Sequence, residues 1–337
     1  MAAAPASRSR SWVLVAVLLI VLVAAFLVHI AVGAGHLNLG AVLRQIFAGD
    51  TGGLDPDNAI VWRLRLPRAC AAAVAGATLG LVGSAFQALF RNPLAEPYIV
   101  GVSSGAAVGG TLALVLGIGS AFFGLATALL ATATGLLALA MVFGLSKRRG
   151  VVDVETLLLA GVVVGSLLGA LVTLIIYVAG DNPMNVLRWL LGSLSPMSWT
   201  KVLLMLVGLV GGGLILGAHA KQLNAFAVGE ETARRLGVNV RRLKPVVLVA
   251  GATMTALTVG AVGVIGFLGL VAPHMARRLL GIDWRWSLMA SGLIGAALLL
   301  VSDLVAQRAI PGTELPVGVV TALLGSPSLL ILLRRSG

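Results

Sequence analysis

The sequence predicts an all-α protein that crosses a membrane about ten times. Hydrophobic residues make up 59% of the 337 residues, charged residues only 11%, and the mean hydropathy is +1.05. Soluble domains carry about 25% charged residues, so a water-soluble surface cannot be built from this composition. Apolar blocks recur along the whole chain, and we therefore treat residues 1–337 as a single transmembrane domain.

Most of the apolar blocks reach the roughly 20 residues that a helix needs to cross a bilayer. The first, from Trp12 to Gly33, is longer than the apolar region of a signal peptide, so we expect an uncleaved span. A further, shorter span is expected at 271–282. The clear blocks lie near 12–34, 69–90, 98–118, 120–145, 156–179, 202–218, 245–270, 287–306 and 315–333.

The net charge of +12 indicates a topology rather than a nucleic-acid partner. If both termini are cytoplasmic, most of the 24 Lys and Arg residues fall in loops on the inner side, as the positive-inside rule requires. On the outer side we expect a polar loop at 35–62 and a short surface helix around Arg188 and Trp189. The single Cys70 lies in an apolar block and cannot form an internal disulfide.

Two apolar segments between 65 and 107 form a predicted helical hairpin. Its compact turn stops both helices, because Pro93 and Pro97 lack an N–H and disfavour helical geometry at the residue before them. We assign this turn to the cytoplasmic side. Gln87, near the inner end of the first helix, could face a pathway or simply another helix. The turn reads Arg91-Asn92-Pro93-Leu94-Ala95-Glu96-Pro97.

Arginines at the outer start of this hairpin allow two interpretations. Arg63, Arg65 and Arg68 surround Pro67. Their side chains could snorkel to the lipid headgroups. Alternatively, they form an exposed basic rim for an acidic partner, because the positive-inside rule makes arginines on the outer side unusual.

The start of the second hairpin helix matches G-x-S-x-G, the nucleophile elbow of hydrolases. That motif needs a strand-to-helix turn together with acid and histidine partners, whereas this segment begins a membrane helix. We interpret its small residues as allowing close helix contacts, as do Gly76/Gly80, Gly161/Gly165/Gly169 and Gly213/Gly217. Ser103 and Ser104 remain candidates to line a pathway.

A short autonomous helix is expected inside the cytoplasmic segment 219–244. Acids stand in its first turn, arginines in its last turn and a glycine follows, which complements the helix dipole and sets up i,i+4 ion pairs. It is either a surface helix that binds anionic lipid or a docking element for a cytoplasmic partner. Its sequence is Gly229-Glu230-Glu231-Thr232-Ala233-Arg234-Arg235-Leu236-Gly237.

Glycine recurs every three residues from Gly260 to Gly269, and Pro273-His274 follows. Each glycine weakens a helix by about 1 kcal/mol relative to alanine, and a membrane tolerates broken backbone only beside protein or water. We therefore predict a reentrant turn or gate that includes Gly263 and Gly266. His274 is not a metal ligand, because the other histidines show no ligand spacing.

Two acids stand near the outer end of the last two long blocks. Asp303 lies inside an apolar block, so it should face the bundle interior or water and be paired. Glu314 precedes Pro316 and is expected to cap the last span.

Taken together, these motifs resemble those of the FecCD family, the permease subunits of bacterial ABC importers for iron-siderophores, haem and cobalamin. The resemblance extends over essentially the whole chain. It rests on Arg65-Leu66-Pro67-Arg68, Gly83…Gln87…Arg91 to Pro97, Gly101…Gly105-Ala106, Gly229…Ala233…Leu236-Gly237, Gly263…Gly266 to His274 and Glu314-Leu315-Pro316-Val317-Gly318.

The resemblance implies the ten-span permease fold of type II ABC importers in the bacterial inner membrane. It also implies a second permease subunit, most simply an identical one, two cytoplasmic ATPases and an external substrate-binding protein. Arg65 and Arg68 match outer arginines that meet the binding protein. The third such arginine falls at Gln307, so the adjacent Arg308 is its candidate replacement. The matches to the ATPase-coupling helix are Gly229, Glu230, Ala233, Arg234, Leu236 and Gly237.

The predicted function is the inward transport of a metal chelate, with an iron-siderophore complex first and cobalamin or haem as alternatives. No G-x-x-x-x-G-K-[ST] motif is present, so we predict no enzymatic activity for this chain, no cofactor and no metal site. A different class, an ion-gradient transporter, would need ionisable residues near the midplane, and the predicted spans carry almost none.

Overall fold

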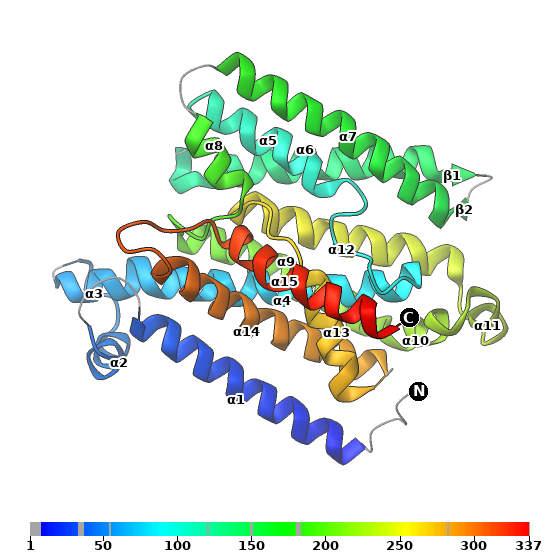
Figure 1. Ribbon diagram of the computed structural model, residues 1–337, viewed down its shortest axis with the longest axis horizontal. Coiled ribbons are helices and arrows are strands. Elements are labelled where there is room, and N and C mark those ends of the chain that lie inside the picture. Colours follow the sequence, from blue (N-terminus) through cyan, green and yellow to red (C-terminus); the bar gives the residue numbers. More distant parts are fainter. Residues whose placement is uncertain are drawn as a thin grey trace.

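The computed structural model describes residues 8–32, 37–53, 55–119, 121–148, 151–179, 183–281 and 283–336. Parts of the expected outer loop, at 35–36 and 54, lie outside these ranges. Helices dominate, and they lie side by side in an elongated bundle (Figure 1). The only strands in the described ranges are β1 (Lys147–Arg148) and β2 (Val151–Val152), a short antiparallel pair.

The first eight α-helices in the described ranges cover the chain up to Leu190. They are α1 (Arg8–Val32), α2 (Leu39–Ala48), α3 (Pro56–Ile60), α4 (Leu66–Phe90), α5 (Val102–Val115), α6 (Ala121–Ser146), α7 (Val154–Ala179) and α8 (Pro183–Leu190), with a π-helical turn, η1 (Val61–Arg65), joining α3 to α4. The remaining helices are α9 (Trp199–Ala218), α10 (Ala220–Val228), α11 (Glu230–Arg235), α12 (Val240–Val262), α13 (Leu268–Leu280), α14 (Trp284–Arg308) and α15 (Val317–Ser336).

The membrane-spanning, all-helical architecture is confirmed. Seven helical stretches in the described ranges are long and apolar enough to cross a bilayer, and the second of them joins α3, η1 and α4 into one continuous stretch. Three further helices, α5, α13 and α15, fall where the sequence predicts the other three spans. A total of about ten spans therefore stays an expectation.

Segments that the sequence assigns to one side of the membrane gather at one end of the bundle (Figure 1). The β1–β2 pair, α10 and α11 lie at the end where α1 begins and α15 finishes. The predicted outer segments α2, α3 and α8 lie at the opposite end, called the outer end below. This grouping agrees with the predicted topology, while the orientation of the termini stays a prediction.

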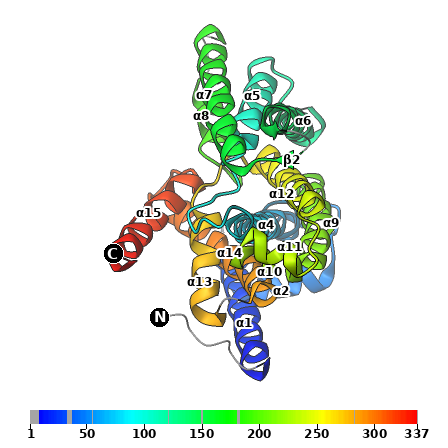
Figure 2. The same cartoon turned by 90° about the vertical axis from the view of Figure 1, so that its right-hand side faces the viewer.

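The centre of the bundle is an antiparallel pair, α4 and α14, which α9, α12 and α13 surround (Figure 2). Glycine lets the two backbones touch: a Cβ added to Gly76 would stand 2.2 Å from the carbonyl oxygen of Gly295, and one added to Gly80 would stand 2.1 Å from that of Ser291. The two contacts agree with an antiparallel pairing. Gly80 lies four residues after Gly76 on α4, and its partner Ser291 lies four residues before Gly295 on α14. The predicted close approach at Gly76 and Gly80 is confirmed.

The other predicted glycine contacts divide into correct and incorrect ones. Gly161 on α7 lies against the backbone of the turn before α5, where an added Cβ would be 2.3 Å from the carbonyl oxygen of Ile99. Gly169 and Gly217 have open space, so their predicted role in helix contact is wrong within this chain, whereas Gly213 on α9 makes an ordinary contact with Leu81 on α4. Spacing alone does not say which face of a helix is covered.

The glycine-rich stretch is a break between two helices, as predicted. Helix α12 ends at Val262, Gly263 takes a positive φ of 75°, and α13 begins at Leu268. Phe267, just before α13, is in the left-handed region with a φ of 67°, which is unusual for a residue with a side chain. The following helix begins a few residues earlier than the predicted 271–282.

Candidate functional site

Side chains from α1, α4 and α14 meet around the buried carboxylate of Asp303 at the outer end. Arg68 donates its Nε to Oδ2 at 2.8 Å and its Nη2 to Oδ1 at 3.0 Å. The Nε2 of His29 lies 2.7 Å from Oδ2, and Gln307 donates its Nε2 to the same oxygen at 2.8 Å. The prediction that Asp303 faces the interior and is paired is confirmed.

Glu314 joins this cluster from the segment before α15. Arg68 donates its Nη1 to both carboxylate oxygens of Glu314 at 3.0 Å. The Glu314 side chain is 49% exposed, whereas that of Arg68 is 13% exposed. The sequence predicts a helix cap at this position, but the carboxylate lies against Arg68 instead. The guanidinium of Arg68 therefore bridges a buried and an exposed acid.

Arg65 does not form part of an exposed rim, so that expectation is wrong for this residue. Its side chain is buried, and its Nη1 donates to the carbonyl oxygens of Ile30 at 2.8 Å and Ala31 at 3.2 Å. Arg308, which is exposed, donates its Nη2 to the carbonyl oxygen of Val32. Both arginines thus satisfy the carbonyl end of α1, and their contact with a binding protein stays a prediction.

The 91–97 turn is tied to the start of α13. Arg91 ends α4 in the left-handed region, and the Oδ1 of Asn92 accepts from the backbone of Leu94 at 2.9 Å. The Oε1 of Glu96 accepts the backbone N–H of the strained Phe267 at 3.0 Å. Arg91 and Pro93 are exposed, whereas Glu96 is half-buried. The turn therefore contacts the break between α12 and α13.

The candidate pathway residues lie in different surroundings. Gln87 is buried and donates its Nε2 to the carbonyl oxygen of Gly269 at 3.1 Å, so it bonds a neighbouring helix. Gly263 lies against the backbone of Trp189, and Gly266 has open space beside it. Pro273 is buried within α13 and His274 is half-buried. Their role in a pathway or gate stays a prediction.

Ser103 and Ser104 lie in the first turn of α5, and both are half-buried. Gly101, which precedes the helix, has a φ of 77°, and no strand leads into it. The strand-to-helix turn that a hydrolase elbow requires is therefore missing at this motif. No group of three or more His, Cys, Asp or Glu side chains in the described ranges could hold a metal ion.

The predicted docking helix forms as α11, next to α10 at the end of the bundle opposite Asp303 (Figure 1). A backbone motif closes it: the N–H of Gly237 donates to Arg234 O, and the N–H of Val238 donates to Ala233 O, both at 3.0 Å. This is a Schellman cap, which needs a left-handed residue at Gly237, where φ is 81°. Ala233 is buried and Leu236 is exposed.

Glu230 connects α11 to α12. Its Oε1 accepts from Nη2 of Arg234 at 2.7 Å, and its Oε2 accepts from Nζ of the buried Lys244 at 2.8 Å. Burial would raise the pKa of the Glu230 carboxyl, but the hydrogen bonds from Lys244 and Arg234 outweigh it and hold that pKa below its usual value. Lys244 was not predicted as a site residue, although a lysine at the start of an apolar helix signals a nearby acid.

Comparison with known proteins gives consistent matches over nearly the whole chain. The model of the FecCD transport family matches residues 19–335. The ABC transporter permease protein YvrB of Bacillus subtilis (strain 168) is 40% identical over 93% of this chain and 91% of that protein. The cobalamin import system permease protein BtuC of Halobacterium salinarum is 41% identical over 82% of this chain and 73% of that protein.

Two further matches extend this similarity. The hemin transport system permease protein HmuU of Yersinia pestis is 36% identical over 89% of this chain and 91% of that protein. Among solved structures, an inward-facing conformation of a metal-chelate type ABC transporter aligns with a TM-score of 0.82. That alignment has 30% sequence identity and covers 96% of this chain and 99% of the solved chain.

Replacing Asp303 should strongly destabilise the bundle. Asp303→Asn leaves Arg68 without its buried partner, and breaking a buried ion pair costs about 3–5 kcal/mol. The control is Glu314→Gln, which removes a half-exposed acid from the same arginine and should cost about 1 kcal/mol or less. Thermal unfolding of the detergent-solubilised protein measures both. Equal midpoints for the two variants would contradict the central role of Asp303.

Replacing Glu230 should loosen α11, whereas replacing its neighbour should not. Glu230→Gln leaves the Lys244 ammonium, 5% exposed, without a carboxylate, at a cost of about 1–3 kcal/mol. Glu231→Gln removes only an exposed pair at 3.4 Å and should change stability by about 0.5 kcal/mol or less. Hydrogen exchange of the α11 amides at neutral pH measures the difference.

The contribution of Glu230 should also depend on pH. Because the native pKa lies below the ordinary value of 4.5, the stabilisation is present at neutral pH and is lost as pH falls from 4.5 through the native pKa. The difference in thermal midpoint between the native protein and Glu230→Gln should therefore close on acidification. A difference that persists in acid would show that the pair does not carry the effect.

Proposed function

Since the chain belongs to the FecCD transport family and is a permease subunit of an ABC importer, we propose that it passes a bulky metal chelate into the cell. The match of the family model to residues 19–335 carries this proposal. The chain is a transport subunit and not an enzyme, and ATP is hydrolysed by a separate partner. The FecCD resemblance favours an iron-siderophore complex as the cargo.

Cobalamin is the second candidate cargo, and a specific observation favours it. A relative that is 41% identical is named a cobalamin import permease, and another that is 36% identical is named a hemin permease. We therefore propose a cargo from the same chemical class, a large metal complex held by an organic ligand. Iron-siderophore, cobalamin and haem all belong to this class, and their uptake is compared in the assay described below.

The proposed assembly contains a second permease subunit, most simply an identical one, two ATPases and an external binding protein. We place the ATPases at α10 and α11 and the binding protein at the outer end near Arg68 and Arg308. The Glu230–Lys244 pair supports a mechanical link from α11 to α12. The break at 263–267 connects α12 to α13. Gln87 donates a hydrogen bond to Gly269 in α13, and Glu96 accepts one from Phe267 just before α13. Movement of α11 would then shift the break and alternate access.

An ion-gradient transporter is the competing class. Among the described spans, the buried acid is Asp303, and it is already paired with Arg68 and His29 near one end of the bundle. A proton or sodium relay normally places ionisable residues near the midplane. The position and pairing of Asp303 therefore favour ATP-driven import.

ATP-dependent uptake into proteoliposomes tests the proposed function. The chain is reconstituted with its co-purifying ATPase and binding protein, and ferric siderophore, hemin and cobalamin are offered in parallel. We expect uptake of one chelate that needs both ATP and the binding protein. Uptake driven by an ion gradient without ATP would overturn the proposal and direct attention to Asp303 and Glu314.

The Schellman cap of α11 gives a separate test of ATPase docking. Gly237→Pro cannot adopt a φ of 81° and lacks the N–H that bonds Arg234 O, so ATPase binding should be lost while the protein still inserts. Gly49→Pro is the control, because it disrupts a comparable glycine end of α2 at the outer end. Co-purification of the ATPase measures both. Unchanged binding by Gly237→Pro would contradict the docking role of α11.

A further inference from the structure

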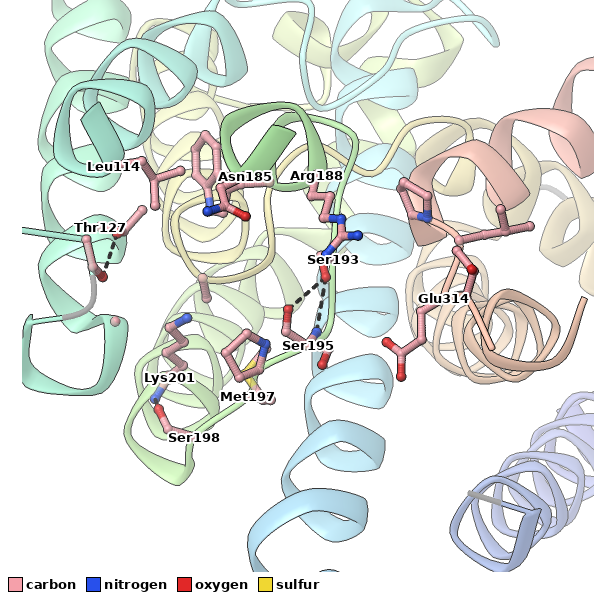
Figure 3. Close-up of a pocket in the computed structure, with 18 of the residues that line it drawn as sticks. Leu114, Thr127, Asn185, Arg188, Ser193, Ser195, Met197, Ser198, Lys201 and Glu314 are labelled. Carbon is pink, nitrogen blue, oxygen red and sulfur yellow. Dashed lines mark hydrogen bonds between the residues drawn. The ribbon is translucent and has the colours of Figure 1, made fainter. Parts of the chain in front are cut away.

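A large cavity with both apolar and charged side chains in its lining opens at the outer end and is not used by any role assigned above (Figure 3). Its volume is about 830 Å³, within the 300–1,000 Å³ typical of small-molecule sites. Its walls come from the end of α5 with Gly119, from the start of α6, from α8, from the 193–198 segment with the start of α9, and from the 312–316 segment before α15. These segments are far apart in the sequence.

Among the described residues that line this cavity, cations outnumber uncompensated acids. Arg188 on α8 and Lys201 on α9 line it, and neither has an ion pair or side-chain hydrogen bond with the described residues. Glu314 is the acid in the lining, but Arg68 already binds both of its oxygens. In Figure 3, Arg188, Lys201 and Glu314 lie around the same hollow. The cavity therefore carries unbalanced positive charge.

The cavity wall makes room for the Lys201 ammonium. Gly124 has a φ of 79°, and a Cβ added there would stand 2.7 Å from the Nζ of Lys201. Any larger residue would press on the ammonium. Lys201 is half-buried, so its charge faces the cavity in surroundings less polar than bulk water. A partly desolvated ammonium binds an anion more strongly than an exposed one does.

Neutral polar groups and one aromatic ring complete the lining. Asn185 offers its amide (Figure 3), and Trp189 is also part of the lining. The hydroxyl of Ser193 is occupied, because it donates to the carbonyl oxygen of Ser195 at 2.9 Å. This mixture of one flat apolar surface and two cations suits a large organic ligand with acidic groups at its edge.

We propose that this cavity is a binding site for an anionic metal chelate, with Lys201 and Arg188 holding its carboxylate or other acidic groups. The proposal rests on the function proposed above and adds a substrate class to it. It predicts that the importer prefers chelates with peripheral negative charge to neutral or cationic chelates of similar size.

Fluorescence quenching tests the charge of the cavity without any knowledge of the cargo. The component due to Trp189, obtained as the difference from Trp189→Phe, should be quenched more by iodide than by caesium in detergent solution. Lys201→Met and Arg188→Gln should each lower iodide quenching about twofold. Lys201→Arg should keep it, and Arg44→Gln, at an exposed position outside the cavity, should not change it. Equal iodide quenching in the native protein and the two charge-removing variants would overturn the proposal.

Uptake by the reconstituted complex tests the substrate class. Ferric citrate and hemin are the anionic probes, and ferrioxamine B and cobalamin are the comparison chelates. In Lys201→Met, the half-saturating concentration of an anionic chelate that is transported should rise about tenfold, as expected for loss of a charge-assisted hydrogen bond. Transport of only ferrioxamine B or cobalamin, or equal uptake by Lys201→Met, would overturn the proposal while leaving the importer function intact.

A lipid phosphate is the other source of an anion at this end of the protein. Quenching is therefore repeated after adding phosphatidylglycerol or phosphatidylcholine to the micelles. If phosphatidylglycerol alone removes the Lys201-dependent quenching, the cavity binds lipid headgroups and the proposal is wrong. Absence of any ATP-dependent uptake would count against the importer function, whereas the quenching result would still decide the charge of the cavity.

Discussion

The backbone contact between α4 and α14 is the constraint on which the rest of the molecule depends. Lipid is as apolar as the helix surfaces, so helices in a membrane associate by close packing rather than by burial from water. Gly76 and Gly295 permit that packing, and Gly80 opposite Ser291 continues it. Arg68 stands eight residues before Gly76, and Asp303 stands eight residues after Gly295. In an antiparallel pair, this equal spacing of about 12 Å places the two charges opposite each other.

Composition and periodicity predicted the class, the long helices and the turn at 91–97, because these depend on local sequence. The predicted helical hairpin is wrong, since α5 packs mainly on α6 and α7 and not on α4. The two prolines of the 91–97 turn stand close together and disfavour a helix through it, and a long apolar block needs a membrane. The pairing of Asp303 was also predictable, since a carboxylate in an apolar span requires a partner. Its partners were not predicted, because Arg68 and His29 lie 235 and 274 residues away. Only the three-dimensional register of the helices brings them together.

The positions of functional side chains were harder to predict than their charges. Arg65 and Arg68 are three residues apart, yet Arg65 turns to the carbonyl end of α1 while Arg68 reaches Asp303 and Glu314. The π-helical turn that ends at Arg65 adds a residue to the helical repeat and changes the direction of the side chains before it. The cavity beside Lys201 likewise has walls from segments that no local pattern connects.

The distance along the chain between Arg68 and Asp303 has a consequence for the synthesis of the protein. Helix α4 leaves the ribosome 235 residues before its acidic partner, and at 5–20 residues per second this interval lasts roughly ten to fifty seconds. Throughout that time Arg68, near the end of a membrane helix, can pair its charge only with lipid headgroups, water or a chaperone. A nascent chain is thus electrostatically incomplete until its last tenth has been made, so a truncated chain that ends before Asp303 leaves the Arg68 charge without its buried partner.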